Sequence, residues 1–202
     1  MSKERKFTYI VGDFETTVYA GQTHTEVWAA GLVPMYTEDV TIAHSIDETF
    51  SYLKSLKANV IAYFHNLKFD GSFWLSYLMK DLGLQQALKP GEQIDFVEEK
   101  YMLNNTFKYS ISELGQWYKI TIKTNNYIIE LRDSLKLLPF SVRAIGEAFK
   151  TKHQKLEMEY TGFRYAGCPI TEKEREYIAN DVLVVKEALE IMFNEGHNAL
   201  TI

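Results

Sequence analysis

Four acidic residues in three short motifs constrain the fold of this 202-residue chain more than any other feature. Asp13 and Glu15 lie in YIVGDFETT, Asp70 lies in AYFHNLKFDGSFW, and Asp181 lies in EYIANDVLVV. If the fold brought them together, each pair about 4 Å apart would cost roughly 4 kcal/mol of repulsion at an effective dielectric of ~20. Such a cluster is tolerable when divalent cations sit in it, and two oxygen-bound cations are a common device for phosphodiester cleavage.

The apolar pattern predicts an α/β fold. Strands are expected at residues 7–14, 26–33, 40–43 and 59–64, followed by an antiparallel run at 107–112, 117–123 and 127–132. Helices are expected after Ser45, at residues 69–82, at 141–149 and from Thr171 to about Asn194, with capping boxes at Ser45/Glu48 and Thr171/Glu174. This order predicts one domain over residues 1–202, with a mixed β-sheet flanked by helices and an antiparallel β-hairpin insertion.

Composition limits the ways in which such a domain could hold nucleic acid. Lys and Arg number 22 against 27 Asp and Glu, a net charge of -5, so a bulk basic footprint is absent. Binding would depend on metals, stacking and a few cations. Cys168 is the one cysteine, which excludes an internal disulfide. No apolar run approaches the ~20 residues of a membrane span and the N-terminus is no signal peptide, so the cytoplasm is the expected location.

Asp13 and Glu15 are two residues apart on a predicted strand. Residues i and i+2 of a strand point to the same face, so both carboxylates can reach one pair of cations. A turn carrying acidic residues, or a cap for the next element, is the alternative that the D-x-E spacing alone leaves open.

The segment that follows the fourth predicted strand has a polar and an aromatic stripe. Asn66 and Asp70 are four residues apart, as are Phe69 and Phe73. The functional interpretation gives Asp70 to a metal, Asn66 and His65 to DNA contacts, and the phenylalanines to base stacking. The structural alternative makes Asn66 a helix N-cap, places His65 at the core edge, and packs both rings inside. For the phenylalanines taken alone, the pattern favours packing.

Tyr177 and Asp181 share a face of the last predicted helix, since they are four residues apart. A phenol in this position can orient a water molecule beside a metal-binding carboxylate. In isolation, the same spacing is typical of a hydrogen-bonded pair on the surface of an amphipathic helix.

Together, the three motifs occur in the order found in the DnaQ-like proofreading exonucleases of the ribonuclease-H-like superfamily. The chain most resembles the N-terminal 3'-5' exonuclease domain of protein-primed family B phage DNA polymerases, over essentially its whole length. The resemblance rests on DFETT (13–17), YFHNLKFDGSF (63–73), DSLKLLPF (133–140), Lys155, Tyr160 and YIAND (177–181).

The resemblance implies specific roles. Two Mg²⁺ or Mn²⁺ ions would be bound by Asp13, Glu15, Asp70 and Asp181. Tyr177 would position the attacking water, and Lys155 would contact the scissile phosphate. The implied single-strand ligands are Thr16, Tyr63, His65, Asn66, Phe69, Phe73, Ser134, Leu135 and Tyr160.

The implied activity is 3'-5' cleavage of single-stranded DNA ends as the proofreading part of phage DNA replication. The implied partners are a DNA 3' end, the polymerase domain of a parent chain and the terminal protein that primes replication. No polymerase motif is present before Ile202, so we expect either an excised domain or a stand-alone relative. An RNA exonuclease on the same fold and a non-catalytic strand- or protein-binding module are the alternatives.

Overall fold

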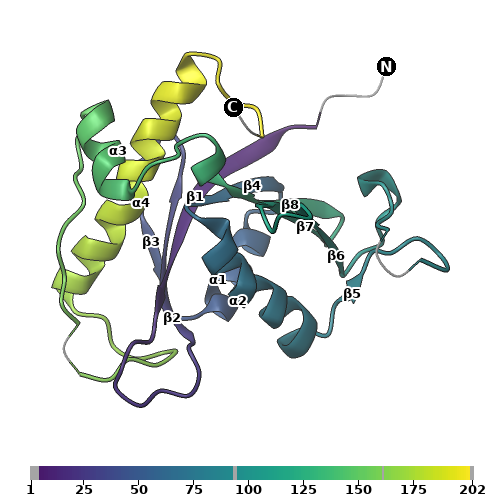
Figure 1. Cartoon of the computed structure of the whole chain (residues 1–202), viewed down its shortest axis with the longest axis horizontal. Coiled ribbons are helices and arrows are strands. Elements are labelled where there is room, and N and C mark those ends of the chain that lie inside the picture. Colours follow the sequence, from purple (N-terminus) through teal and green to yellow (C-terminus); the bar gives the residue numbers. More distant parts are fainter. Residues whose placement is uncertain (1–4, 93–94, 161, 201–202) are drawn as a thin grey trace.

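A mixed sheet of eight strands forms the centre of the computed structural model, which describes residues 5–92, 95–160 and 162–200. The strand order is β3-β2-β1-β4-β8-β7-β6-β5 (Figure 1). The strands are β1 (Phe7–Thr16), β2 (Val27–Pro34), β3 (Thr41–Ala43), β4 (Asn59–Phe64), β5 (Gln85–Gln86), β6 (Thr106–Ile111), β7 (Trp117–Thr124) and β8 (Tyr127–Asp133). The helices are α1 (Ile46–Ser55), α2 (Leu67–Ser76), α3 (Val142–Phe149) and α4 (Glu172–Asn194), with short turns η1 (Tyr77–Asp81), η2 (Glu99–Tyr101) and η3 (Ser134–Lys136).

The strand directions bring three chain segments to one edge of the sheet. Strand β4 runs parallel to both β1 and β8, whereas β2 and β7 are antiparallel neighbours. The carboxyl ends of β1, β4 and β8 therefore meet, and the residues just after them are neighbours in space. The predicted mixed sheet with its antiparallel extension is confirmed.

Helices cover the sheet on both faces (Figure 1). Along β1, Ile10 and Phe14 point into one core, where they meet residues of α1 and α2 such as Trp74. Val11 points into the other core, against residues of α3 and α4 such as Val182. This alternation is the strand period of two, and it places Asp13 and Glu15 on the α4 face of the sheet. Among the described residues, no helix is long and apolar enough to cross a membrane.

The start of one helix and the capping of another differ from the prediction. The helix expected at residues 69–82 begins at Leu67, and its second half, Tyr77–Asp81, is a π-helical turn. At the start of α1, the Glu48 amide donates to the Ser45 hydroxyl, but the Glu48 carboxylate accepts from the amide of His44. The predicted box with Ser45 is therefore only half formed. The box at the start of α4, between Thr171 and Glu174, is confirmed.

Gly31 allows α4 to approach the sheet closely at the level of Asp13, its partner on β1. A Cβ atom at Gly31 would lie 3.0 Å from Ile178 Cγ2, 3.1 Å from the Ile178 carbonyl oxygen and 3.2 Å from Val182 Cγ1. Because Asp181 lies between these two α4 residues, the missing side chain helps to bring Asp181 to β1.

We predict that Gly31→Ala destabilises the chain by about 1–3 kcal/mol, because the added methyl group overpacks a backbone contact. Urea unfolding monitored by circular dichroism measures the change. An unchanged free energy of unfolding would show that α4 can shift without cost and does not depend on this contact.

Candidate metal centre

Three of the four predicted metal ligands converge at the end of β1. Asp13 and Glu15 come from the strand, and Asp181 comes from the middle of α4. One ligand atom from each of the three lies within 4.8 Å of the others. Carboxylate oxygens at this spacing suit a hard divalent cation.

Asp70 reaches the same region from α2, on the other side of the strand end. It lies outside the group of three. Of the neighbouring charges, however, that of Asp70 raises the pKa of Asp13 the most. Its Oδ1 atom is buried and has no hydrogen-bond partner among the described residues, and the same is true of Asp181 Oδ1. Unpartnered buried carboxylate oxygens are costly in a folded protein, and a bound cation would satisfy both. The four residues therefore fit the divalent cations that the motifs predict.

Burial dominates the electrostatics of the cluster. It raises the pKa of Asp13 well above its usual range, and repulsion by Asp70, Glu15 and Asp181 raises it further. Burial also raises the pKa of Glu15 to about 7 and that of Asp70 to about 8. The metal-free cluster therefore retains protons near neutral pH. A cation would displace these protons when it bound, so metal affinity should increase with pH.

Lys155 joins the two α4 residues of the predicted site. Its Nζ atom donates to Tyr177 Oη at 2.7 Å and forms an ion pair with Asp181. The same ammonium lies 4.5 Å from the centre of the Tyr177 ring. Burial raises the pKa of Tyr177, so the phenol stays protonated, whereas Lys155 opposes the rise. The arrangement fixes the phenol beside the acidic cluster.

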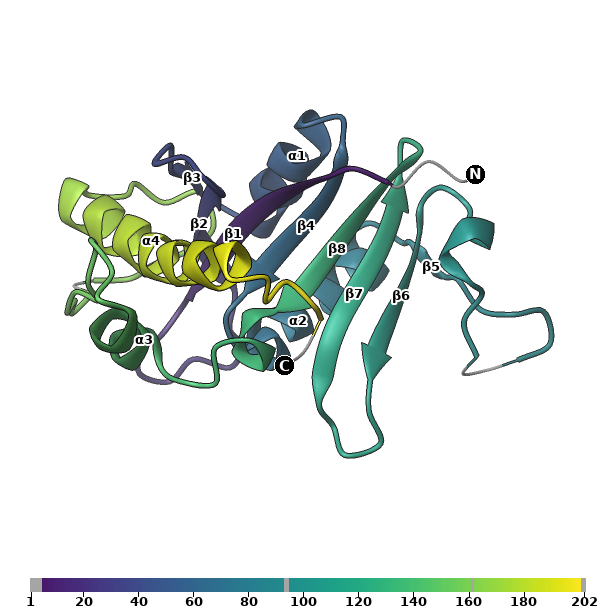
Figure 2. The same ribbon diagram turned by 90° about the horizontal axis from the view of Figure 1, so that it is seen from above.

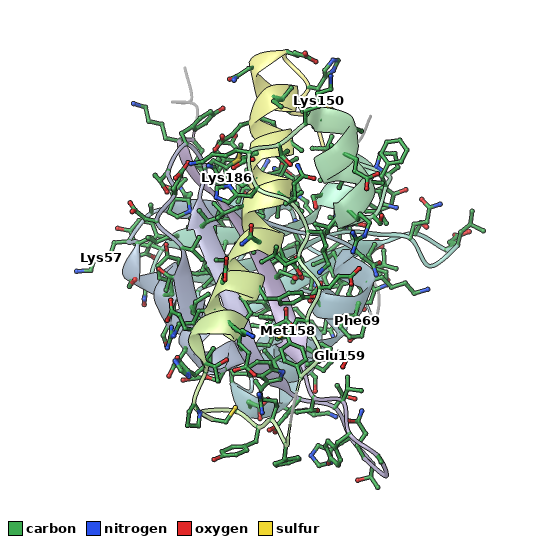
Figure 3. All side chains as sticks on the ribbon, turned by 90° about the vertical axis from the view of Figure 1, so that its left-hand side faces the viewer. Lys57, Phe69, Lys150, Met158, Glu159 and Lys186 are labelled. Atoms are coloured by element: carbon green, nitrogen blue, oxygen red, sulfur yellow. The ribbon has the colours of Figure 1, made fainter. Side chains whose placement is uncertain are left out.

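Tyr160 contacts the cluster directly. Its hydroxyl donates to Glu15 Oε2 at 2.6 Å, and its ring packs edge-on against Trp28 and Tyr177. Burial, followed by the charge of Glu15, raises the pKa of Tyr160, so it remains a donor. The loop from Lys155 to Tyr160 thus provides a contact to Asp181 at one end and to Glu15 at the other. In Figure 3, Met158 and Glu159 of this loop are seen between the lower part of α4 and Phe69.

Asp133 connects the end of β8 to the start of α2, a role that was not predicted from the sequence. Its buried carboxylate accepts from the backbone amides of Asn66 and Leu67 at 3.1 Å and of Leu135 at 3.0 Å. Asn66 occupies the N-cap position of α2, but with left-handed backbone angles and no side-chain cap bond. Asp133 caps α2 in its place and links the helix to the end of β8. The DSLK motif contained this residue, but the partner is 66 positions away and is invisible in sequence.

The predicted strand-binding residues separate into accessible and buried groups. Phe69 is 48% exposed, which contradicts the packing alternative for this ring, whereas the half-buried Phe73 contacts both Phe69 and the core. Asn66 is exposed. Thr16, His65 and Leu135 are partly exposed, as the row of burial classes shows.

Tyr63 and Ser134, which were predicted as strand contacts, have buried side chains. Tyr63 is completely buried in the core beneath α4, next to Phe193. Ser134 is also fully buried, and its hydroxyl is 3.0 Å from Nδ1 of His65, whose Nε2 is 2.7 Å from the Phe140 carbonyl oxygen. In this conformation neither side chain reaches the surface. Tyr63 packs in the core, and Ser134 contacts the ring of His65.

Comparisons with known proteins identify the family of the chain. The family described as DNA polymerase type B, organellar and viral, matches residues 52–201. The DNA polymerases of Bacillus phages Nf and phi29 are each 35% identical over 196 residues, covering 94% of this chain and 31% of theirs. The DNA polymerase of Streptococcus phage Cp-1 is 31% identical over 157 residues, covering 70% of this chain and 23% of its own.

Solved structures give the same result. Phi29 DNA polymerase complexed with single-stranded DNA matches 97% of this chain and 33% of its own, with 32% identity and a TM-score of 0.79. Its complex with primer-template DNA matches with a TM-score of 0.78 at 32% identity. The chain spans about a third of the length of these relatives.

We predict that the metal-free chain loses stability as pH rises between about 4 and 8, and that Asp70→Asn reduces this loss. A carboxyl group whose pKa is higher in the folded state contributes its full stability at low pH, and loses it as pH rises through the folded value. Between pH 5 and pH 8, the free energy of unfolding should therefore fall by at least about 1 kcal/mol more in the wild type than in the variant. Urea unfolding in EDTA at the two pH values measures this. Equal losses would mean that Asp70 is ionised without penalty.

Proposed function

Because this chain belongs to the family of organellar and viral type B DNA polymerases, we propose that it is a metal-dependent 3'-5' exonuclease. Its substrate would be the 3' end of single-stranded DNA. The observation that supports this most strongly is the convergence of Asp13, Glu15 and Asp181 beside the Lys155–Tyr177 pair, with Asp70 adjacent. The three motifs supply these groups in the order of the proofreading exonucleases.

The four carboxylates would hold two divalent cations, Mg²⁺ or Mn²⁺. Cations so placed supply charge stabilisation at the scissile phosphate and lower the pKa of water toward 7. Tyr177 contributes an oriented hydroxyl that can hold a water molecule for attack. Lys155 has three N–H donors, of which Tyr177 and Asp181 use two. Among the described residues the third has no partner, so it could donate to a phosphate oxygen.

Accessible side chains next to the cluster would hold the strand. Phe69 presents a half-exposed ring on which a base can stack, and Asn66 and His65 offer polar contacts nearby. Stacking on aromatic rings holds single strands without reading their sequence, as removal of any mispaired 3' terminus requires. A DNA polymerase of similar sequence and fold has been solved in complex with single-stranded DNA, which supports single-stranded DNA as the ligand.

The proposed biological role is proofreading within a protein-primed replication system of phage type. The partners would be the polymerase part of a longer chain and the terminal priming protein, in the cytoplasm of the infected cell. The size of the relatives supports the first partner, since this chain spans about a third of their length.

We predict that replacing Asp13 and Glu15 with Ala abolishes cleavage and leaves the thermal unfolding transition intact. Removing buried like charges relieves repulsion in the metal-free protein, whereas the cations lose two ligands. The assay follows a 5'-labelled single-stranded DNA and a matched RNA in Mg²⁺ or Mn²⁺. A 3'-shortened DNA ladder from the wild type alone is expected. Preferential RNA cleavage would point to an RNA exonuclease, and strand binding in EDTA with no cleavage in either metal would point to a binding module.

We predict that Phe69→Ala weakens single-strand binding by about 1–3 kcal/mol with little loss of folding stability, because the ring stacks on a base. Tyr101→Ala is the matched control, since Tyr101 is also an exposed aromatic residue (64%) but lies in η2. Fluorescence anisotropy in EDTA gives the affinities. Equal effects of the two substitutions would contradict a specific stacking role.

A further inference from the structure

One face of the antiparallel extension carries an unusual concentration of basic residues. Four basic residues and one acidic residue of β6, β7 and β8 share this face. We call it the basic face, and its members are Lys108, Lys119, Lys123, Glu130 and Arg132. The pairing register places them as neighbours, since Lys119 is opposite Arg132. Thr121 sits between Lys108 on β6 and Glu130 on β8. The intervening residues of these strands point into the core on the opposite side.

Within the part of the chain that the structure describes, neither α2 nor α4 packs on the basic face. Helix α4 packs on β1, β2 and β3, whereas α2 packs on β7 and β8 from the core side. Figure 2 shows β6, β7 and β8 with no helix in front of them, within the part of the chain that the structure describes. The face lies on the same side of the sheet as α4, and its four basic side chains are half-buried. The chain before β6 contacts it through the carbonyls of Val97 and Met102, which accept from Lys108 and Lys123.

Positive charge is in excess on this face. Glu130 is paired with both Lys119, at 2.7 Å, and Arg132, at 2.6 Å. Lys108 donates to the Val97 carbonyl at 3.0 Å and Lys123 donates to the Met102 carbonyl at 2.7 Å. Among the described residues neither lysine has a carboxylate partner, and each keeps N–H donors free. This contrasts with the net charge of -5 for the whole chain.

A cavity of about 390 Å³ adjoins Lys108. Three basic side chains line it: Lys89 is paired with Asp95 and Lys119 with Glu130, whereas Lys108 has no carboxylate partner among the described residues. The one carboxylate in the lining, that of Glu98, is paired with Lys100. Thr121 also lines it, and the Thr121 hydroxyl is buried without a hydrogen-bond partner in the described structure. A cavity with surplus positive charge and an unsatisfied hydroxyl suits an oxyanion, because both lysine and hydroxyl groups donate to its oxygens.

We propose that the basic face binds the phosphodiester backbone of a nucleic acid strand, with the cavity beside Lys108 receiving one phosphate group. A polyanion complements a row of cations on an otherwise acidic molecule, and backbone contacts of this kind are independent of sequence. None of these residues belongs to the metal centre, so this is a second contact region beyond the proposed catalytic function.

The test compares Lys108→Gln/Lys123→Gln with wild type by fluorescence anisotropy on a labelled single strand of about 20 nucleotides, in EDTA so that no cleavage intervenes. Loss of two phosphate contacts should lower affinity about 3- to 10-fold at about 50 mM salt and reduce the slope of log K against log salt by about 1.4. Lys57→Gln/Lys80→Gln is the matched control, since both lysines are exposed and the charge change is equal. Figure 3 shows Lys57 at the periphery of the molecule.

Three results would overturn the proposal: no change in affinity or salt slope, an equal change in the control, or failure of Lys108→Arg to retain binding while the chain remains folded by circular dichroism. Inorganic phosphate provides a separate arm. In this arm, the melting temperature of the wild type and of Lys108→Gln is measured with millimolar phosphate. If phosphate raises it only in the wild type while both bind the strand equally well, the cavity binds free phosphate and not a strand.

Discussion

Asp13, Glu15 and Asp181 bring like charges together at the end of β1, where burial deprives them of water. The repulsion destabilises the folded state, and contacts around the cluster hold the carboxylates in place despite it. Gly31 lets α4 approach closely enough to deliver Asp181, and Asp133 fixes the start of α2, which delivers Asp70. The positions of Asp181 and Asp70 are therefore set by contacts between residues that lie far apart in sequence.

The loop from Lys155 to Tyr160 moderates the repulsion in the metal-free chain. Lys155 places a positive charge against Asp181, and the Tyr160 hydroxyl donates to Glu15. Both contacts lower the pKa of their carboxyl partners, although burial outweighs them. The same two side chains would lie beside a bound phosphate, so one loop serves both the stability of the free protein and the proposed chemistry.

The order of the three motifs and the family resemblance identified the acidic residues. Strand and helix periods explained only why Asp13 shares a face with Glu15, and Tyr177 with Asp181. Sequence reasoning predicted the mixed sheet from the apolar pattern. It could not find the role of Asp133, because the amides that Asp133 binds come from another strand end. It also did not predict that the side chains of Tyr63 and Ser134 are buried, because motif position does not reveal whether a side chain points out of the core or into it. Phe69 shows the converse, since its pattern alone favoured packing and the ring is half exposed.

The central claim is that these carboxylates form a cation site, and calorimetric titration of Mn²⁺ into the metal-free chain at pH 7 tests it most directly. Measurement in two buffers of different ionisation enthalpy also counts released protons. The account predicts binding accompanied by proton release, and loss of both in Asp181→Asn, because the cation replaces protons held by the buried cluster. Absence of binding, or binding that is unchanged in the variant, would contradict it.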